Sequence, residues 1–199
     1  MKKLKLGKVN LMTGKETIKK YKIFINICEF FFNILPYFVL SFIYDVSSSY
    51  ENKLAILFRY LYVKRFSKNS GENIFIGSRV ILKNLPNMTF GNNISIHSGS
   101  YIDAAGEIQI DSNVSIASQV CIYSFNHTWN DTSLPIKYNP TKLDKIFIKE
   151  DVWIGTKAVI LAGVNIESRT VIAAGSVVNK NITNNTLVAG VPAKIIKKI

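Results

Sequence analysis

Histidine and cysteine are scarce in this chain, and their scarcity excludes several kinds of site. Among 199 residues there are only His97 and His127, and only Cys28 and Cys121. Two cysteines build no disulfide framework, which fits a reducing compartment, and each is expected as a small, partly buried apolar residue. A zinc site needs three or four closely spaced ligands, so no metal is expected. Glycine-rich loops of the kinds that bind nucleotide phosphates are also missing.

Acidic residues are few as well, which makes the chain strongly basic. There are 25 lysines and arginines against 13 aspartates and glutamates, a formal net charge of +12. Such a charge favours an anionic partner: nucleic acid, an acidic membrane surface or a phosphorylated ligand. Nucleic acid is not expected, because no basic stripe is interleaved with aromatic residues and no reading motif is present. The lysines gather in residues 2–22 and 194–198 instead.

The chain also lacks an uninterrupted apolar run of the length that spans a membrane. Residues 30–44 carry no charge but contain Pro36, and extending the run back to residue 23 includes Glu29, whereas a spanning helix needs about 20 apolar residues. No small-residue cleavage site follows, so a signal peptide is not expected. Three readings stay open: helices packed on the domain, a helix in the membrane interface, or a span. The lysines before the run suit the anionic inner face of the membrane in either membrane reading, and in the second reading residues 1–46 make a peripheral contact with it.

What the chain has in abundance is a six-residue repeat. Units of six follow one another without a gap from residue 148 to 178, and the same frame recurs earlier. Its positions are Phe90, Ile96, Ile102, Ile110, Ile116, Ile122, Ile148, Ile154, Ile160, Ile166, Ile172 and Val178. Neither a helix period of 3.6 nor a strand alternation of 2 requires a register of six. A hexapeptide period indicates a parallel β-helix, in which each short strand pairs with the equivalent strand one coil away.

The frame breaks twice, and each break predicts a local feature. Two extra residues around Gly106 are enough for a bulged corner. A much longer insertion, about residues 127–147, has no hexapeptide phase. Since three hexapeptides make one triangular coil, we expect this loop to leave from a corner between coils, with His127 at its root. We also expect an amphipathic helix over residues 50–67, with Leu54, Leu57 and Leu61 on one face, to cap the unpaired first strands.

Three runs in the repeat region are distinctive: Asp151-Val-Trp-Ile-Gly, Ile172-Ala-Ala-Gly-Ser-Val-Val and Ala189-Gly-Val-Pro-Ala-Lys. With them, residues 74–199 resemble the hexapeptide-repeat acyltransferases, in particular the galactoside, maltose and surface-polysaccharide acetyltransferases. The resemblance implies a left-handed coil, although ordinary crossovers are right-handed. The expected fold is mainly β: residues 71–199 form a left-handed parallel β-helix with an inserted catalytic loop. Residues 1–70 form an N-terminal extension with a basic arm and hydrophobic and amphipathic helices, and residues 193–199 a short basic tail.

The resemblance implies that His127 is the general base of an acetyl transfer from acetyl-CoA. An alcohol must lose its proton as it attacks a thioester carbonyl. An imidazole, whose ordinary pKa is about 6.5, offers a neutral acceptor nitrogen at cell pH. The alternative is a plain loop histidine at the surface.

The resemblance also implies a coenzyme site. Backbone groups of Thr156 and Ala174 would contact the pantetheine arm in a groove between subunits, and an N–H of that row is a natural oxyanion donor. Trp153 matches a tryptophan beside that groove, as a wall or as a direct contact. Three lysines match basic positions that meet the coenzyme's phosphates, as point charges. They are Lys180, Lys194 and Lys197, for which a solvated basic tail is the plainer alternative.

Four residues are expected around the acceptor. His97 would line its pocket or lie plainly at the surface, and Asp103 would orient the imidazole, hold a sugar hydroxyl or be solvated. Trp129 and Asp131 lie on the inserted loop, where a tryptophan serves as a platform for a sugar ring or simply anchors the loop. The galactoside enzymes carry an acceptor-binding aspartate where Ala105 stands here, so their exact acceptor is not carried over.

These observations together predict a cytoplasmic homotrimer that transfers an acetyl group from acetyl-CoA to a sugar hydroxyl. The expected acceptor class is a surface-polysaccharide or lipid-linked precursor, an expectation that rests on analogy. Two rivals stay open: N-acetylation of an amino sugar nucleotide, and a β-helix scaffold without catalysis.

Overall fold

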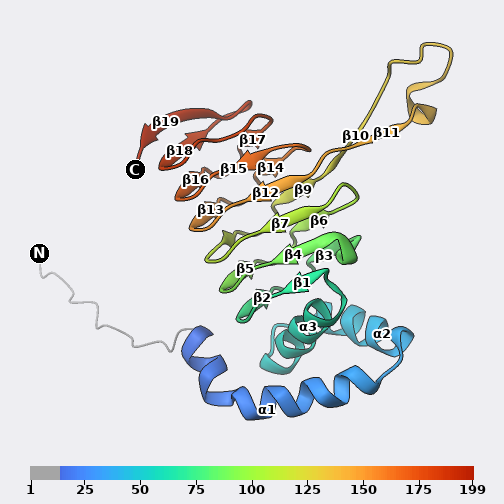
Figure 1. The fold of residues 1–199 in the computed structure, drawn as a ribbon, viewed down its shortest axis with the longest axis vertical. Helices are drawn as coiled ribbons and strands as arrows, with labels where there is room; N and C mark the ends of the chain where they lie inside the picture. The colour runs from blue at the N-terminus through green and yellow to red at the C-terminus, as the bar shows by residue number, and fades with distance from the viewer. Residues whose placement is uncertain (1–13) are drawn as a thin grey trace, which may run out of the picture.

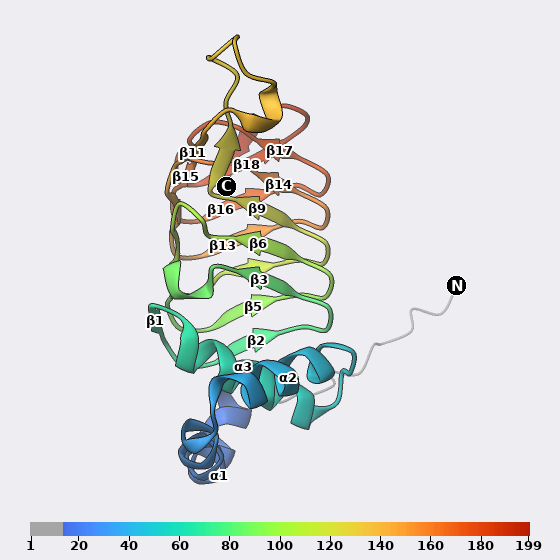
Figure 2. The ribbon, with the colours of Figure 1, turned by 90° about the vertical axis from the view of Figure 1, so that its right-hand side faces the viewer.

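Three helices and a stack of short strands make up residues 14–199, the part of the chain that this computed structural model describes (Figure 1). The helices come first: α1 (Gly14–Ile34), α2 (Tyr37–Ser48) and α3 (Lys53–Phe66). They lie together at one end of the stack, and the coils continue from there toward the C-terminus (Figure 2). The predicted mainly-β fold with an N-terminal helical extension is confirmed.

Three sheets form the sides of the coil stack, and their strands are parallel apart from the last strand of the chain. Sheet A contains β1 (Asn69–Ser70), β4 (Met88–Phe90), β7 (Ile108–Ile110), β12 (Ile146–Ile148) and β15 (Asn165–Ile166). Sheet B contains β2 (Ile74–Ile76), β5 (Ile94–Ile96), β8 (Ser115–Ile116), β13 (Val152–Ile154), β16 (Thr170–Ile172), β18 (Thr186–Ala189) and β19 (Lys194–Lys198). Sheet C contains β3 (Ile81–Lys83), β6 (Tyr101–Asp103), β9 (Cys121–Tyr123), β14 (Val159–Ile160) and β17 (Val177–Val178). The chain passes through A, B and C in turn, so each passage is one coil of a parallel β-helix.

The core of the stack consists of the frame positions of the repeat. In sheet B, Ile96, Ile116, Ile154 and Ile172 pair in direct register from coil to coil. All twelve frame positions are at most 2% exposed. Because equivalent isoleucines stack in register, each side chain packs against the isoleucines of the coils above and below it. Close packing of this kind is typical of protein cores. The hexapeptide frame therefore gave the correct core.

The corner between sheets A and B is built by residues with a positive φ. Asn73, Asn93, Asn113, Asp151 and Arg169 have φ between 53° and 61°. Asparagine tolerates this region better than most residues. The asparagine amides also bond to one another along the stack, at 3.0 Å and 2.9 Å, and the guanidinium of Arg169 donates to Asp151 at 3.0 Å. Polar side chains thus align successive coils at this corner.

The helix α3 covers the open end of the stack, as predicted for residues 50–67. Tyr60, Leu61 and Val63 are buried against the first coil. The predicted apolar face is wrong at one position, since Leu54 is 56% exposed. Leu54 lies in the first turn of α3 and lines a shallow apolar groove with residues of α2, such as Phe42, instead of contacting the coil.

Arg59 joins three parts of this end of the molecule and was not foreseen from the sequence. Its side chain is fully buried. Its Nε donates to the carbonyl of Ile76 at 2.8 Å, and its Nη1 donates to the carbonyls of Ser47 and of Tyr50, the latter at 2.9 Å. Its Nη2 has no partner within residues 14–199. One guanidinium therefore ties α2, the turn after it and the first coil together.

The hydrophobic run of residues 23–46 forms two helices divided at Pro36. α1 bends at Tyr21 and ends at Ile34, and Arg65 of α3 donates to two carbonyls near that end at 2.8 Å and 3.0 Å. These bonds satisfy carbonyl groups that a helix end leaves unpaired. Cys28 is half-buried against the core, and Cys121 is half-buried on β9. None of the helices described here is both long enough and apolar enough to cross a membrane.

The C-terminal residues are basic and exposed, as predicted, but they form a strand that the sequence did not predict. Residues 182–189 add a partial further coil, in which Ile182 bridges to Ile166 and β18 pairs with β16. β19 then folds back antiparallel on β18. The reason is that β18 would otherwise expose a row of unpaired backbone groups, and the last residues supply the partners.

Candidate active site

His127 lies at the root of the inserted loop, as predicted. It ends β10 (Phe125–His127), which follows β9 and pairs antiparallel with β11 (Thr141–Leu143). These two strands carry the loop away from the stack between the third and fourth coils (Figures 1 and 2). The imidazole is exposed, contacts the ring of Phe125 edge-on at 6.2 Å, and makes no hydrogen bond to a residue in 14–199. Both nitrogens are therefore available to a ligand or to another copy of the chain.

An aromatic column on the outer face of sheet C leads to His127. The rings of Tyr101 and Tyr123 lie 5.5 Å apart, and Tyr123 contacts Phe125 edge-on at 6.1 Å. Burial raises the pKa of Tyr123. These aromatic residues were not predicted from the sequence. The repeat gives no signal for them, because Tyr101 and Tyr123 pair with Cys121 and Asp103 and so occupy different places in their units.

Asp103 does not orient the His127 imidazole. Asp103 ends β6, which lies one coil nearer the helices than β9, and it pairs in register with Tyr123 of β9. Its Oδ1 accepts a hydrogen bond from the amide of Asn84 at 2.7 Å and from the N–H of Ala105 at 3.1 Å. These partners hold the carboxylate in the turn that follows β6, which leaves a sugar hydroxyl or solvent as its other interaction.

The inserted loop is closed on itself by Asn139. This buried side chain accepts a hydrogen bond from the N–H of Asp131 at 3.0 Å and donates to three carbonyls of the loop, among them that of Asp131 at 3.1 Å. The Asp131 carboxylate accepts from the N–H and hydroxyl of Ser133, and these bonds lower its pKa. Asp131 therefore shapes the loop. Trp129 is 68% exposed on the same loop and is available as a platform.

A pair of unpaired backbone amides lies at the corner between sheets B and C. The N–H groups of Thr156 and Ala174, one coil apart, donate to no acceptor within residues 14–199. Each precedes a residue with positive φ, Lys157 at 58° and Gly175 at 70°. Gly155 lets the two coils approach here, since a Cβ at this position would lie 2.6 Å from the Ala174 nitrogen. This corner offers two exposed hydrogen-bond donors in a column, which we call the amide pair.

Two further predicted residues lie on the sheet B side of that corner. Trp153 stands on the outer face of β13, 54% exposed, between Ser115 and Val171 in register. His97 directly follows β5, and its ring contacts Phe75 at 5.4 Å. His97 is therefore grouped with Trp153 and the amide pair, and the structure does not bring it to His127.

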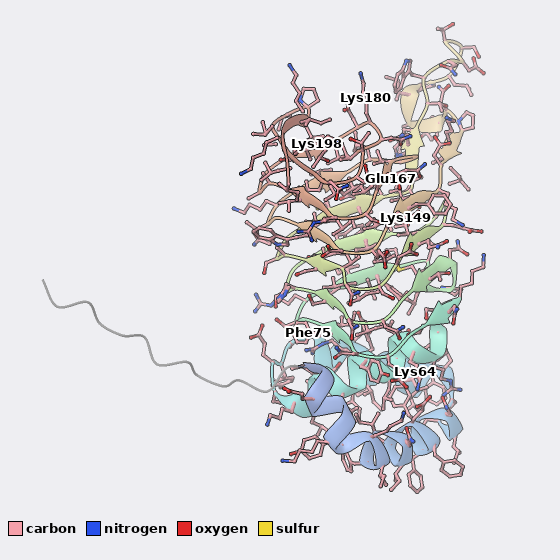
Figure 3. All side chains as sticks on the ribbon, turned by 60° about the vertical axis from the view of Figure 1, so that its left-hand side comes forward. Lys64, Phe75, Lys149, Glu167, Lys180 and Lys198 are labelled. Atoms are coloured by element: carbon pink, nitrogen blue, oxygen red, sulfur yellow. The ribbon has the colours of Figure 1, made fainter. Side chains whose placement is uncertain are left out.

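The three predicted phosphate-binding lysines are divided between two sides. Lys180 follows β17 at the edge where sheet C ends, and Lys194 and Lys197 are on β19 in sheet B (Figure 3 labels Lys180). All three are exposed, and none forms an ion pair within the described residues. They are free to meet anionic groups.

Sheet C separates the two groups of site residues. Its strands begin at the amide pair and end at the edge from which the His127 loop leaves. A three-residue strand spans about 10 Å. Within one chain, His127 and the amide pair therefore lie at opposite ends of the strands of sheet C.

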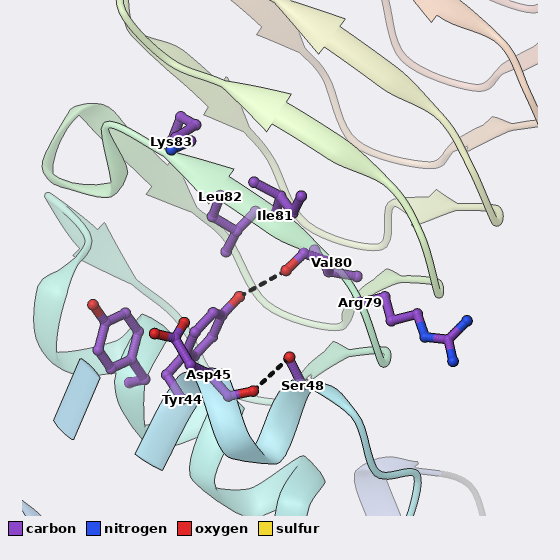
Figure 4. Close-up of a pocket in the computed structure, with 9 residues that line it drawn as sticks. Tyr44, Asp45, Ser48, Arg79, Val80, Ile81, Leu82 and Lys83 are labelled. Atoms are coloured by element: carbon purple, nitrogen blue, oxygen red, sulfur yellow. Dashed lines mark hydrogen bonds between the residues drawn. The ribbon is translucent and has the colours of Figure 1, made fainter. Parts of the chain in front are cut away.

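A cavity of about 380 Å³ lies near the helices, between α2 and β3 (Figure 4). The hydroxyl of Tyr44 donates there to the carbonyl of Val80 at 3.1 Å. Its charged lining residues are Asp45, Arg79 and Lys83. β3 is two coils from β9, so the cavity contains none of the predicted site residues. Residues 14–199 also contain no group of three histidine, cysteine or acidic side chains that could hold a metal.

Comparison with known proteins places this geometry in a family. The family model of the bacterial transferase hexapeptide (six repeats) matches residues 145–180. The galactoside O-acetyltransferase of Escherichia coli K12 is 30% identical over 196 residues, which cover 94% of this chain and 90% of that protein. A putative lipopolysaccharide biosynthesis O-acetyl transferase of the same organism is 31% identical over 141 residues, 66% of this chain and 72% of that protein.

Solved structures of acetyltransferases have a similar fold. A galactoside acetyltransferase in complex with coenzyme A has a TM-score of 0.71 at 28% identity, over 78% of this chain and 76% of that one. A hexapeptide-repeat acetyltransferase from Vibrio cholerae, complexed with acetyl coenzyme A, has a TM-score of 0.70 at 26% identity, over 78% and 82%. The chain belongs to the hexapeptide-repeat acetyltransferases, which confirms both the predicted family and the predicted class of enzyme.

Proposed function

We propose that this protein transfers an acetyl group from acetyl-CoA to a hydroxyl of a sugar, with His127 as the general base. The observation that carries the proposal is the placement of His127 on one edge of sheet C and of the amide pair on the other. Among residues 14–199, the imidazole at one edge has no hydrogen-bond partner, and the two N–H groups at the other edge have no acceptor. Two such edges, from adjacent copies, complete an acyl-transfer site.

The reaction follows from these groups. A nitrogen of His127 accepts the proton of the acceptor hydroxyl while its oxygen attacks the thioester carbonyl carbon. The new C–O bond forms, the C–S bond breaks, and the imidazolium returns the proton to the departing thiolate. An N–H of the amide pair donates to the carbonyl oxygen as negative charge develops there. No covalent acyl-enzyme is required.

The assembly we propose is a homotrimer, with one site in each groove between neighbours. The groove holds the two substrates side by side, which lowers the entropic cost of their encounter. Trp153 lines the groove, Lys180 comes from one copy, and Lys194 and Lys197 come from the other to meet the phosphates of the donor. Light scattering should give a mass of three chains of 22.4 kDa.

The acceptor class we propose is a precursor of a surface polysaccharide. A relative that matches two thirds of this chain carries lipopolysaccharide biosynthesis in its name. The aromatic column beside His127 supports a carbohydrate, because aromatic faces suit the apolar faces of sugar rings. Asp103 and Trp129 would contact this acceptor, and His97 would reach it from the neighbouring copy.

The experiment is thiol release from acetyl-CoA by the purified protein, with a panel of sugars, polysaccharide precursors and amino sugar nucleotides. His127→Ala is expected to lower acceptor-dependent release by about 100-fold or more. Asn126→Ala, a change at the preceding exposed residue, is the matched control and should leave most of the activity. Equal rates for wild type and His127→Ala contradict the assigned base. Release only with amino sugar nucleotides would establish N-acetylation instead.

A further inference from the structure

The N-terminal helices leave a large apolar surface uncovered. It consists of the exposed apolar side chains of α1 from Ile23 to Ile34 and of α2 from Tyr37 to Val46, which we call the base patch. Ile23 is 80% exposed, Phe31 63% and Phe38 74%. Soluble monomers rarely expose contiguous apolar surface on this scale without a function. The base patch therefore calls for an occupant.

The pattern along α1 shows that this surface is a distinct face of the helix. Ile23, Ile27, Phe31 and Ile34 recur at intervals of three and four residues, the spacing of one helical face. The other face packs on α3, where Phe32 is buried. Glu29, the one charged residue between Ile23 and Tyr44, turns to that inner face and accepts from the ammonium of Lys64 at 2.6 Å. The outer face of α1 from residue 23 onward is left without a charge.

The position of the base patch argues against a second copy as its occupant. α1 forms the end of the molecule in both ribbon views, beyond α3 and the first coil (Figures 1 and 2). Side chains of α1 point away from the stack there (Figure 3). The two groups of site residues lie along the sides of the stack, so copies that complete each other's sites meet side by side. Such an assembly leaves the base patches uncovered, all at the same end.

Charge identifies the complementary surface. Residues 1–22 contain eight lysines and one glutamate, and they lead directly into the base patch. Lys20 is exposed at its margin, and Lys22 is exposed beside it, with its ammonium 3.6 Å from the carboxylate of Glu72. Apolar and aromatic side chains flanked by lysines are typical of helices that lie in the interface of an anionic bilayer. Aromatic rings are also favoured at that depth.

We infer that the base patch docks the enzyme on an anionic membrane surface, with α1 and α2 in the interface and the coils pointing away from it. The apolar side chains insert at the boundary of the acyl chains, and the lysines contact the lipid phosphates. This goes beyond the proposed reaction and does not depend on the identity of the acceptor, but the argument against a second copy rests on the side-by-side assembly of the proposed function.

Flotation with lipid vesicles tests the inference. The full-length protein is mixed with vesicles of phosphatidylcholine alone or with phosphatidylglycerol added. We expect it to float with the anionic vesicles, more weakly at high salt and poorly with neutral ones. A variant with Ile23→Gln, Phe31→Gln and Phe38→Gln keeps good helix formers. It should require at least about tenfold more lipid for half-binding.

The matched control changes three exposed apolar residues of the inserted loop, Leu134→Gln, Ile136→Gln and Tyr138→Gln, and should float like the wild type. Wild-type protein that stays free of anionic vesicles overturns the inference, as does normal flotation of the base-patch variant. A base-patch variant that loses oligomeric mass shows instead that the patch is a subunit interface. Docking without sugar acetylation would refute the proposed function alone.

Discussion

The backbone N–H of Ala174 can be removed without breaking a hydrogen bond within residues 14–199. Ala174 lies between Ala173 and Gly175, whose φ is 70°, and the N–H of Ser176 donates to the carbonyl of Ala173 at 3.3 Å. This pattern is that of a type II turn, in which proline is favoured at the place that Ala174 occupies. Ala174→Pro therefore deletes one hydrogen-bond donor in a conformation that proline adopts.

The size of the effect separates two roles for this donor. If the N–H binds the pantetheine arm, the loss of one hydrogen bond worth about 1–1.5 kcal/mol raises the Kd for acetyl-CoA about five- to tenfold. If it stabilises the oxyanion, kcat falls by about 100-fold or more while the Kd changes little. Calorimetric titration with acetyl-CoA and steady-state thiol release measure the two quantities. Thr156→Pro removes the other donor of the amide pair, one coil away and before Lys157, but it also removes the hydrogen bond from Thr156 Oγ1 to the carbonyl of Ser118 at 2.6 Å.

The control is Ser168→Pro, at the corner between sheets A and B in the coil of Ala174. Ser168 likewise precedes a residue with positive φ, Arg169 at 53°, and its N–H donates to no residue in 14–199. It should bind acetyl-CoA and turn over like the wild type. Folded Ala174→Pro and Thr156→Pro proteins with unchanged Kd and kcat would refute the role of the amide pair. Equal losses in Ser168→Pro would show that the losses come from strain.

Three further changes test the scaffold. Arg59→Ala should lower the free energy of unfolding by about 3 kcal/mol, because it leaves the buried carbonyls of Ser47 and Ile76 and the partly buried carbonyl of Tyr50 without their donor. A loss below about 1 kcal/mol in a urea titration contradicts this. Gly155→Ala should lower the Tm and weaken acetyl-CoA binding, since its Cβ would lie 2.6 Å from the Ala174 nitrogen; an unchanged Tm would show that the corner can relax. Asn139→Ala should speed tryptic cleavage after Lys137 while the coil stack keeps its Tm; an unchanged cleavage rate means that other contacts close the loop.

The coil stack was predictable because every coil follows the same six-residue pattern as the coils it packs against. A residue such as Ile154 is buried by Ile116 and Ile172, which obey the same six-residue rule, so one period specifies the core, the pairing and the register together. The helical end follows no such rule. Arginine is usually a surface residue. Arg59 is buried only because α2, α3 and the first coil meet around its side chain. The strand β19 was missed because its partner is the open edge that the coils leave behind.

The candidate site was predictable where it depends on position within a coil. His127 was placed by the break in the frame, and Thr156 and Ala174 by their place at a corner. The side-chain partners were not predictable. Asn84 donates to the carboxylate of Asp103 and Ser133 to that of Asp131, in turns that the repeat does not encode. His97 and His127 lie at opposite ends of the strands of sheet C. This separation can be seen only once the path of the chain around the coil is known.

The packing of the helices on the first coil determines how far His127 lies from the base patch. From the axis of α1 to that of α3, and from α3 to the first coil, are helix-packing steps of about 10 Å each, and two coil spacings of about 5 Å lead from β3 to β9. His127 thus stands about 30 Å from the layer that we infer to rest on lipid. An acceptor anchored in the same membrane must extend that far before a hydroxyl reaches the imidazole. The sugar attached directly to the lipid lies below the site, so the length of the glycan, as well as its composition, would decide when acetylation begins.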